Sequence, residues 1–304
     1  MIRSTSSVVL CAVLAATLLP APVATAAPAP GPGAVSHFGL ARKDCLGTAR
    51  NTTSKAWFTV AGGVLSDVYA PVIDNTNVET LQFAVTDGAT FTDLQARDMT
   101  YTVRTSAGGM ACEVTSTPRS GRYRLVTDYL TDPARTGVLI RTRLEPLRDS
   151  GRDLKVYVRF DASINGNGGG GPANGGGDTA TVDPATSALV SADTTTVSSA
   201  PARDYGTPLA AALRADRRFL TTSSGFAGTA GDGLAQLDRD HRLTDPTPSA
   251  VNGNVVQTAQ LDLQPHRPSV LALGFGADAR AAVATAGASL RTPFEASYRQ
   301  YARE

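Results

Sequence analysis

The sequence predicts an all-β protein, a large antiparallel β-sandwich with a C-terminal linker helix. Two observations point to this fold. Between residues 37 and 276, short segments alternate apolar and polar residues, and turn residues separate them. Segments with clear helical periodicity come only from residue 277 onward. Strands with one apolar and one polar face are typical of antiparallel sheets stacked on each other.

Residues 1–26 have the features of a secretory signal peptide. Arg3 supplies a positive charge, an apolar stretch covers residues 8–19, and Ala24-Thr25-Ala26 matches a small-residue cleavage site. An uncleaved anchor is the alternative, but the apolar stretch is short for spanning a bilayer. We therefore expect a secreted, extracellular protein in which the Pro/Ala/Gly-rich residues 27–36 form a flexible leader.

The charge balance argues against two classes of partner. Cleavage after residue 26 would leave 278 residues with 27 Lys plus Arg and 27 Asp plus Glu. This balance lacks the basic excess that binds nucleic acid or an anionic membrane surface. No later segment is apolar enough to span a membrane, and the length allows one large core or two small ones. We expect neither nucleic acid nor membrane as a partner.

The strands of the first half follow from the period-2 pattern. They are predicted at residues 56–60, 64–69, 80–85, 99–103 and 123–129. Ala61-Gly62-Gly63 between the first two is a hairpin signal. Trp57 is the only tryptophan and could stack on a sugar ring, but its strand also contains Phe58 and Val60, so we expect it in the core.

Two central strands alternate without a break. In residues 138–144 the even positions are Val, Ile, Thr and Leu, with Arg141 and Arg143 on the opposite face. In residues 154–160 the even positions are Leu, Val, Val and Phe. Later strands are predicted at residues 188–191, 195–199, 219–222, 255–263 and 269–275. Residues 208–214 are interpreted as a helical turn.

Two helices are predicted at the C-terminus. Asp278 suits the N-cap of a helix that runs to Leu290. Thr292 suits the N-cap of a second helix, with Pro293 at its first position and Glu295 completing a capping box. Because this second helix is only beginning near residue 304, we interpret residues 277–304 as linker helices that are cut short before a further domain.

The cysteines allow two interpretations. Cys45 and Cys112 remain after cleavage, and an even pair in an oxidising compartment favours a disulfide. Two buried free thiols are the alternative. The sequence has no CxxC motif and no Cys/His cluster, so we expect no zinc site and no cofactor.

A glycine-rich stretch spans residues 165–177 and contains the Gly-x-Gly-x-x-Gly spacing of a dinucleotide-binding loop. That motif must open a helix, and Pro172 followed by further glycines prevents one here. We therefore predict a mobile surface loop. A calcium-binding glycine-rich repeat is disfavoured, because Asp178 is the only carboxylate near it in the sequence.

No catalytic residue can be selected. The histidines His37, His241 and His266 do not have the spacing of metal ligands, and no Gly-x-Ser-x-Gly motif is present. Sugar hydrolysis needs a pair of carboxylates, but nothing in the sequence distinguishes one pair among the 27 acidic residues.

Several ordered segments resemble a known family. Residues 63–71, GVLSDVYAP, and 80–88, TLQFAVTDG, are similar to the N-terminal domain of bacterial glucodextranases and glucoamylases, which belong to glycoside hydrolase family 15. Further similar segments follow in the same order, at residues 121–125, 131–135, 158–163, 222–228, 253–258 and 271–276. Two positions depart from the family: Ala70 replaces its usual aromatic residue, and Leu234 replaces its usual tryptophan.

The resemblance implies a super-β-sandwich of the galactose-mutarotase-like kind over residues 37–276, joined by a linker to a catalytic (α/α) barrel. This barrel, which carries the family's catalytic glutamates, has no counterpart here. We therefore expect a non-catalytic domain that supports or shapes the barrel of an α-glucan hydrolase and that hydrolyses nothing alone. The alternatives are a stand-alone module that binds α-glucans such as dextran or starch, and a partner of a separately encoded catalytic chain.

Three residues are candidates for contact with substrate or with the barrel. Tyr69, Pro71 and Asp74 follow a predicted hairpin, combine an aromatic ring with a carboxylate, and lie in one of the segments most similar to the family. The other interpretation is a turn that only closes two strands.

Overall fold

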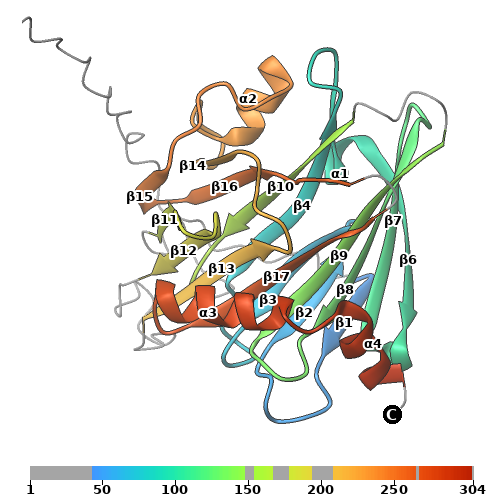
Figure 1. Ribbon diagram of the computed structural model, residues 1–304, viewed down its shortest axis with the longest axis vertical. Helices are drawn as coiled ribbons and strands as arrows, with labels where there is room; N and C mark the ends of the chain where they lie inside the picture. Colours follow the sequence, from blue (N-terminus) through green and yellow to red (C-terminus); the bar gives the residue numbers. More distant parts are fainter. Residues whose placement is uncertain (1–42, 148–153, 167–177, 194–207, 265–266, 303–304) are drawn as a thin grey trace, which may run out of the picture.

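The computed structural model describes residues 43–147, 154–166, 178–193, 208–264 and 267–302. In these residues two antiparallel sheets stack on each other, with short helices on their outer faces (Figure 1). The predicted all-β sandwich is therefore confirmed. The predicted signal peptide, the leader at residues 27–36 and the strand at 195–199 lie outside the described residues, as do His37, His266 and most of the glycine-rich stretch.

The first sheet, called sheet A here, has eight strands. In spatial order they are β1 (Cys45–Thr48), β2 (Trp57–Ala61), β3 (Val64–Tyr69), β4 (Val78–Thr86), β10 (Lys155–Ala162), β16 (Val255–Gln260) and β14 (Thr222–Phe226), with β5 (Thr92–Leu94) pairing with β4. The predicted hairpin is present, because β2 and β3 pair across Gly62 and Gly63, which both have positive φ.

The second sheet, sheet B, has nine strands. In spatial order they are β15 (Ser249–Gly253), β11 (Asp178–Val182), β12 (Leu189–Asp193), β13 (Leu209–Ala215), β17 (Ser269–Gly276), β9 (Gly137–Pro146), β8 (Tyr123–Thr131), β7 (Ala111–Pro118) and β6 (Met99–Ser106). Strands far apart in sequence are therefore neighbours, as where β17 lies between β9 and β13.

The main core fills the space between the two sheets. Sheet A contributes Phe83 and Val158, and sheet B contributes Leu125 and Ile140, all fully buried. These side chains occupy alternate positions along their strands, so the apolar face predicted for residues 138–144 and 154–160 is the face that packs in the core.

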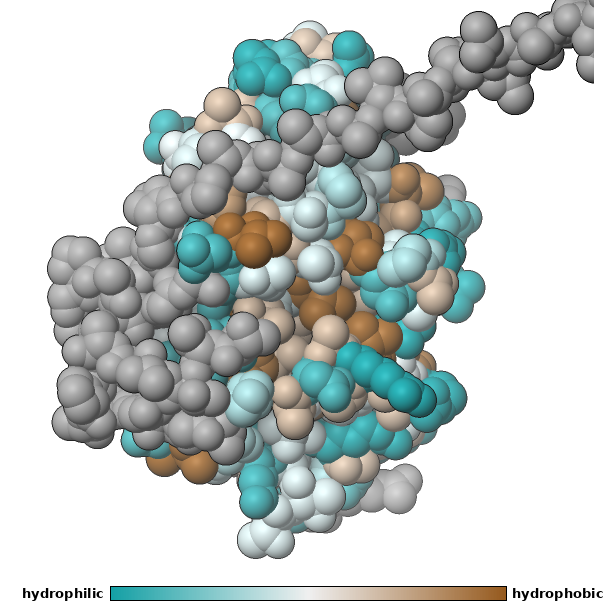
Figure 2. Space-filling view, turned by 90° about the vertical axis from the view of Figure 1, so that its left-hand side faces the viewer, coloured by the Kyte–Doolittle hydropathy of each residue, from teal (hydrophilic) through white to brown (hydrophobic). Residues whose placement is uncertain are grey.

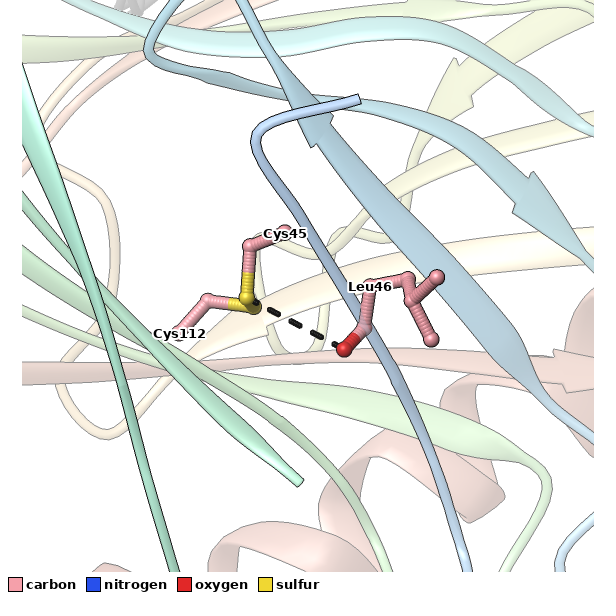
Figure 3. Close-up of a disulfide and its surroundings, with 3 residues drawn as sticks. All are labelled: Cys45, Leu46 and Cys112. Carbon is pink, nitrogen blue, oxygen red and sulfur yellow. Dashed lines mark hydrogen bonds between the residues drawn. A yellow bond between two sulfur atoms is a disulfide. The ribbon is translucent and has the colours of Figure 1, made fainter. Parts of the chain in front are cut away.

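A disulfide joins Cys45 of β1 to Cys112 of β7 (Figure 3). The two Cα atoms are 6.2 Å apart and the residues are 67 positions apart in sequence. Because β1 belongs to sheet A and β7 to sheet B, this bond links the two layers covalently at the edge of the core.

Two C-terminal helices, α3 (Ala279–Leu290) and α4 (Phe294–Ala302), pack against sheet B on the face away from the main core. The Asp278 carboxylate accepts the N–H of Ala281 at 2.7 Å, so the predicted N-cap is confirmed. Small residues let α3 approach closely: a Cβ added to Gly274 of β17 would lie 2.5 Å from the backbone nitrogen of Ala286. The outer face of sheet B is therefore partly covered.

The prediction for residues 208–214 was wrong. This segment is strand β13, with Leu209, Ala211 and Leu213 in the main core and Ala210 and Ala212 in the second cluster, which includes residues of α3 and α4. Alanine favours helices in isolation, but burial of both strand faces overrides that preference here.

Other elements differ from the predicted set. The strand predicted at 219–222 begins only at Thr222, as β14. The sequence patterns did not identify β1, β5, β7, β11, β15, α1 (Gln95–Asp98), the 3₁₀ turn η1 (Ala107–Gly109) or α2 (Gly233–Asp240).

Candidate functional site

The three candidate residues lie together in the connection between β3 and β4, residues 69–77, which we call the β3–β4 corner. Tyr69 is partly exposed, and Pro71 and Asp74 are exposed. Between them lie two apolar side chains that the sequence analysis did not single out, Val72 and Ile73, which are 45% and 62% exposed. The corner therefore presents consecutive apolar side chains to the surface.

An aromatic neighbour lies beside the corner. Trp57 pairs with Tyr69 across the β2–β3 ladder, and both are partly exposed. Phe58 and Val68, the next residues along each strand, are buried in the main core. Since successive side chains of a strand point to opposite faces, Trp57 and Tyr69 lie on the outer face of sheet A. The prediction that Trp57 belongs to the core was wrong.

One buried asparagine holds the corner in place. The Asn77 side-chain amide donates to the carbonyl oxygens of Ala70, at 2.8 Å, and Asn75, at 3.0 Å. Its Oδ1 accepts the backbone N–H of Asn165 at 2.9 Å. The N–H of Gly166 also donates to the carbonyl of Thr76. Both ends of the corner are thus tied to each other and to the segment that follows β10.

The two departures from the family both fall on inward-facing positions. Ala70 is fully buried in the main core, so this position offers no side chain to a partner. Leu234 packs against a small cluster that includes Leu94, Tyr157 and Leu237. In this chain the two positions therefore contribute to internal packing.

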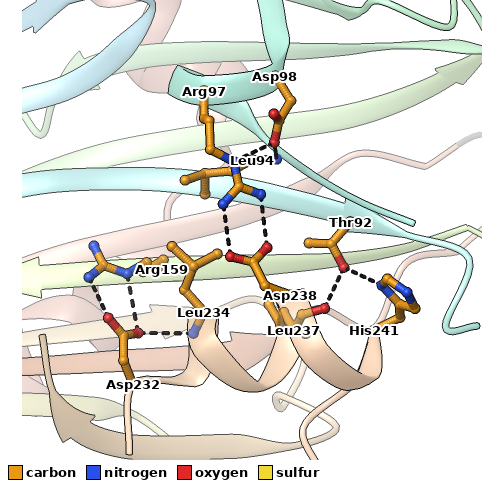
Figure 4. Close-up of polar contacts among 10 residues, drawn as sticks. All are labelled: Thr92, Leu94, Arg97, Asp98, Arg159, Asp232, Leu234, Leu237, Asp238 and His241. Atoms are coloured by element: carbon orange, nitrogen blue, oxygen red, sulfur yellow. Dashed lines mark hydrogen bonds and ion pairs between the residues drawn. The ribbon is translucent and has the colours of Figure 1, made fainter. Parts of the chain in front are cut away.

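A buried charge cluster lies on the outer face of sheet A, beneath α2 (Figure 4). Arg159 of β10 is 8% exposed and bonds Asp161 at 2.6 Å and Asp232 at 2.9 Å. Burial raises the pKa of Asp161 to about 6, although the neighbouring guanidinium lowers it. Asp232 also caps α2 by accepting the N–H of Leu234 at 2.9 Å. This cluster joins the helix to the sheet.

A second set of contacts attaches α2 from the side of α1 and β5 (Figure 4). Arg97 donates two hydrogen bonds of 2.8 Å to the Asp238 carboxylate. The Thr92 hydroxyl donates to the carbonyl of Leu237 at 2.7 Å and lies 3.0 Å from Nδ1 of His241. His241, which lacks the spacing of a metal ligand in the sequence, therefore has a structural contact with β5.

Two further kinds of site are absent from the described ranges, a metal-binding cluster of acidic, His or Cys side chains and a membrane-spanning helix. No group of three or more His, Cys, Asp or Glu side chains there has an arrangement suited to a metal ion. None of the helices described is long and apolar enough to cross a membrane.

Comparisons with known proteins give consistent matches. The family model for glucodextranase, domain N, matches residues 29–304. A glucoamylase from Clostridium sp. (strain G0005) is 29% identical over 247 residues, which cover 81% of this chain and 32% of the relative. The crystal structure of a bacterial glucoamylase complexed with acarbose superposes with a TM-score of 0.77 at 25% identity, over 91% of this chain and 39% of that one. The chain thus spans about a third of the curated relative.

Proposed function

This chain belongs to the glucodextranase domain N family and corresponds to the N-terminal domain of a glucoamylase-like enzyme, and we propose that its role there is non-catalytic. It packs against a catalytic (α/α) barrel in a secreted α-glucan hydrolase and stabilises it, with the β3–β4 corner as the docking surface. The observation that supports this role is the pair of exposed apolar side chains, Val72 and Ile73, on a corner whose backbone is held by buried hydrogen bonds.

Single exposed apolar residues are common on protein surfaces and need no explanation. Here two such residues are consecutive, and the three bonds of Asn77 order their backbone before any partner arrives. A preordered loop loses less conformational entropy on docking. Burying a Val or Ile side chain completely contributes about 1.5–3 kcal/mol, so the pair can supply a substantial part of a domain contact.

A chimeric enzyme tests the docking role. The N-terminal domain of the bacterial glucoamylase would be replaced by residues 27–304, and the melting temperature and glucose release from maltose would be measured. We expect V72S/I73S to lower the melting temperature of the chimera more than it lowers that of the isolated chain. The matched control is L147S/L220S, which also removes two exposed apolar side chains; Leu220 lies beside Gln260, at the end of β16 away from the corner.

Equal effects of the two double variants on the chimera would count against the corner as the docking surface. A separate measurement tests the non-catalytic role: the purified chain should release no glucose from maltose or dextran. Release above that of a buffer blank, and proportional to chain concentration, would contradict the proposal.

The alternative, a stand-alone module for dextran or starch, has less support. Sugar-binding surfaces use exposed aromatic rings, and among the described large apolar residues that are most exposed, Tyr101 is the single aromatic, at 42%. Retardation of the chain in gels containing dextran or starch would favour this alternative over docking.

The intact mass of the protein secreted by its host tests export and chain organisation together. If the signal peptide is cleaved as proposed, the measured mass should correspond to a chain that begins at Ala27. A mass larger by a catalytic domain would support a single polypeptide, and a mass near that of residues 27–304 would instead favour a separately encoded partner.

A further inference from the structure

Two buried carboxylates lie opposite each other where β11 meets β12, two strands that run side by side in Figure 1. The register pairs Thr179 with Ala192, so its continuation places Asp178 opposite Asp193. Asp178 is fully buried and Asp193 is 5% exposed. Like charges directly opposite each other on a sheet are destabilising, so this pair requires compensation.

Both carboxylates lie on the inner face of sheet B. On β12, Leu189 belongs to the main core, whereas Val190 belongs to the cluster under the C-terminal helices. On β11, Ala180 packs with Phe226 of sheet A. Since every second residue of a strand shares a face, Asp178 and Asp193 lie on the side that faces sheet A, away from bulk solvent.

Two buried oxygens at this place, one on Asp178 and one on Asn75, have no hydrogen-bond partner within the part of the chain that the structure describes. Asp178 Oδ2 accepts the N–H of Ile164 at 2.8 Å, but its Oδ1 is buried with no hydrogen-bond partner. Asn165 donates to Asp193 at 3.3 Å and accepts from Asn75 at 2.9 Å. The Oδ1 of Asn75 is also buried without a partner. A buried polar atom without a hydrogen-bond partner destabilises the fold.

No positive side chain among the described residues forms an ion pair with Asp178. The unpartnered atoms are a carboxylate oxygen and an amide oxygen, which are acceptors and cannot satisfy each other by hydrogen bonding. A cation bound among them would satisfy both and would also remove the repulsion between the two carboxylates.

We propose that Asp178, Asp193 and Asn75 bind a calcium ion at the inner edge of the sandwich. Calcium takes carboxylate and amide oxygens as ligands, accepts irregular geometry and completes its shell with water or backbone carbonyls. The ion would tie the β11–β12 pair to Asn75, one of the residues of the β3–β4 corner. This site differs from a glycine-rich calcium-binding repeat, because its second carboxylate comes from the neighbouring strand.

The competing explanation for the two neighbouring carboxylates is that Asp178 is protonated. Burial, together with the charge of Asp193, raises the pKa of Asp178 well above its usual range, and a protonated Asp178 would also remove the repulsion. The two explanations differ in their response to calcium and to Asp178→Asn, because asparagine reproduces the neutral acid but binds calcium poorly without its charge.

Calcium titration of the EDTA-treated full chain tests the proposal. Isothermal calorimetry should show one site per chain. The melting temperature should rise by several degrees at about 10 mM calcium, a concentration above the weakest affinities of extracellular calcium modules. D178N should weaken calcium binding by at least about tenfold, as expected for loss of a charged ligand. The matched control is D161N: Asp161 is also a buried carboxylate with an unpartnered oxygen, but it pairs with Arg159, so the calcium response should persist.

Two results would overturn the proposal. One is a wild-type chain that shows neither binding heat nor a shift in melting temperature at about 10 mM calcium. This test does not depend on whether any variant folds. The other is a D178N variant that folds and responds to calcium as the wild type does. If D178N does not fold, N75A takes its place and should weaken calcium binding; an unchanged affinity in N75A would equally contradict the site.

Discussion

Arg159 and Asp232 form a two-pronged ion pair that joins strand β10 to the start of helix α2 (Figure 4). The Nη2–Oδ2 distance is 2.9 Å and the Nε–Oδ1 distance is 3.4 Å. Because Asp232 also accepts the N–H groups of Leu234 and Gly228, one carboxylate connects the sheet, the helix and the loop that precedes the helix.

Replacing Arg159 by methionine should reduce the free energy of unfolding by about 3–5 kcal/mol, because it leaves the carboxylates of Asp161 and Asp232 buried without their counterion. Urea denaturation measures this loss. The control is Arg97→Met. Arg97 also donates two hydrogen bonds to one aspartate carboxylate, but its side chain is 45% exposed. Its loss should therefore lower the free energy of unfolding by less than about 1 kcal/mol. Equal losses in the two variants would show that burial of the Arg159 ion pair adds nothing to its contribution to stability.

Removing the Asn77 side chain should loosen the β3–β4 corner. Asn77→Ala removes the Asn77 bonds of the Ala70 carbonyl and the Asn165 N–H in a buried place, whereas the Asn75 carbonyl keeps its bond from the Ala70 N–H. We therefore expect a loss of about 2–4 kcal/mol in unfolding free energy. Limited proteolysis should also cut faster within residues 69–77. The control is Asn254→Ala. It keeps the backbone carbonyl of residue 254, which accepts the N–H of Ala227, so the unfolding free energy should change by no more than about 0.5 kcal/mol. Unchanged cleavage in N77A would contradict the support role.

Enlarging Ala286 should disrupt the packing of α3 on sheet B. Ala286 is fully buried and its backbone nitrogen lies close to Gly274, so Ala286→Leu should destabilise the fold by about 1–3 kcal/mol through overpacking. Thermal unfolding measures the effect. The same substitution at Ala284, which is exposed on the same helix, should change stability by no more than about 0.5 kcal/mol; a comparable loss there would point to helix propensity instead of packing.

Reducing the disulfide should destabilise the sandwich by about 4 kcal/mol, the value that chain entropy predicts for a loop of this length closed across 67 positions. Urea denaturation with and without reductant measures the difference. The C45A/C112A double variant is the control: it should match the reduced wild type and should not respond to reductant. A wild type that is equally stable in both conditions would mean that the bond adds nothing to the fold.

Much of the architecture could be predicted from local patterns. The alternation in residues 154–160 and 138–144 indicates strands and identifies which face enters the core, because a side-chain period of two is a property of the extended backbone itself. The cap at Asp278 is equally local, since an N-cap depends on a carboxylate within three residues of a free N–H. The family could also be identified, because its ordered segments are linear in the sequence.

The sequence pattern misled us at positions whose burial depends on segments far away in the chain. The alanine-rich segment at residues 208–214 was interpreted as a helical turn, and it is the strand β13 because the main core lies on one side and the helix cluster on the other. Trp57 was expected inside because its neighbours are apolar, yet it lies on the outer face with Tyr69. Nothing in a single segment reports which surfaces other segments will cover.

The sequence by itself therefore determined the fold class, the C-terminal helices and the family, because each depends on interactions or patterns within short stretches of chain. Only the tertiary structure decided the sites. It exposed Val72 and Ile73 on a corner held by Asn77, and the register of β11 and β12 brought Asp193 opposite Asp178. The physical reason is that strand register and sheet stacking, which act between distant segments, decide exposure and the meeting of polar groups.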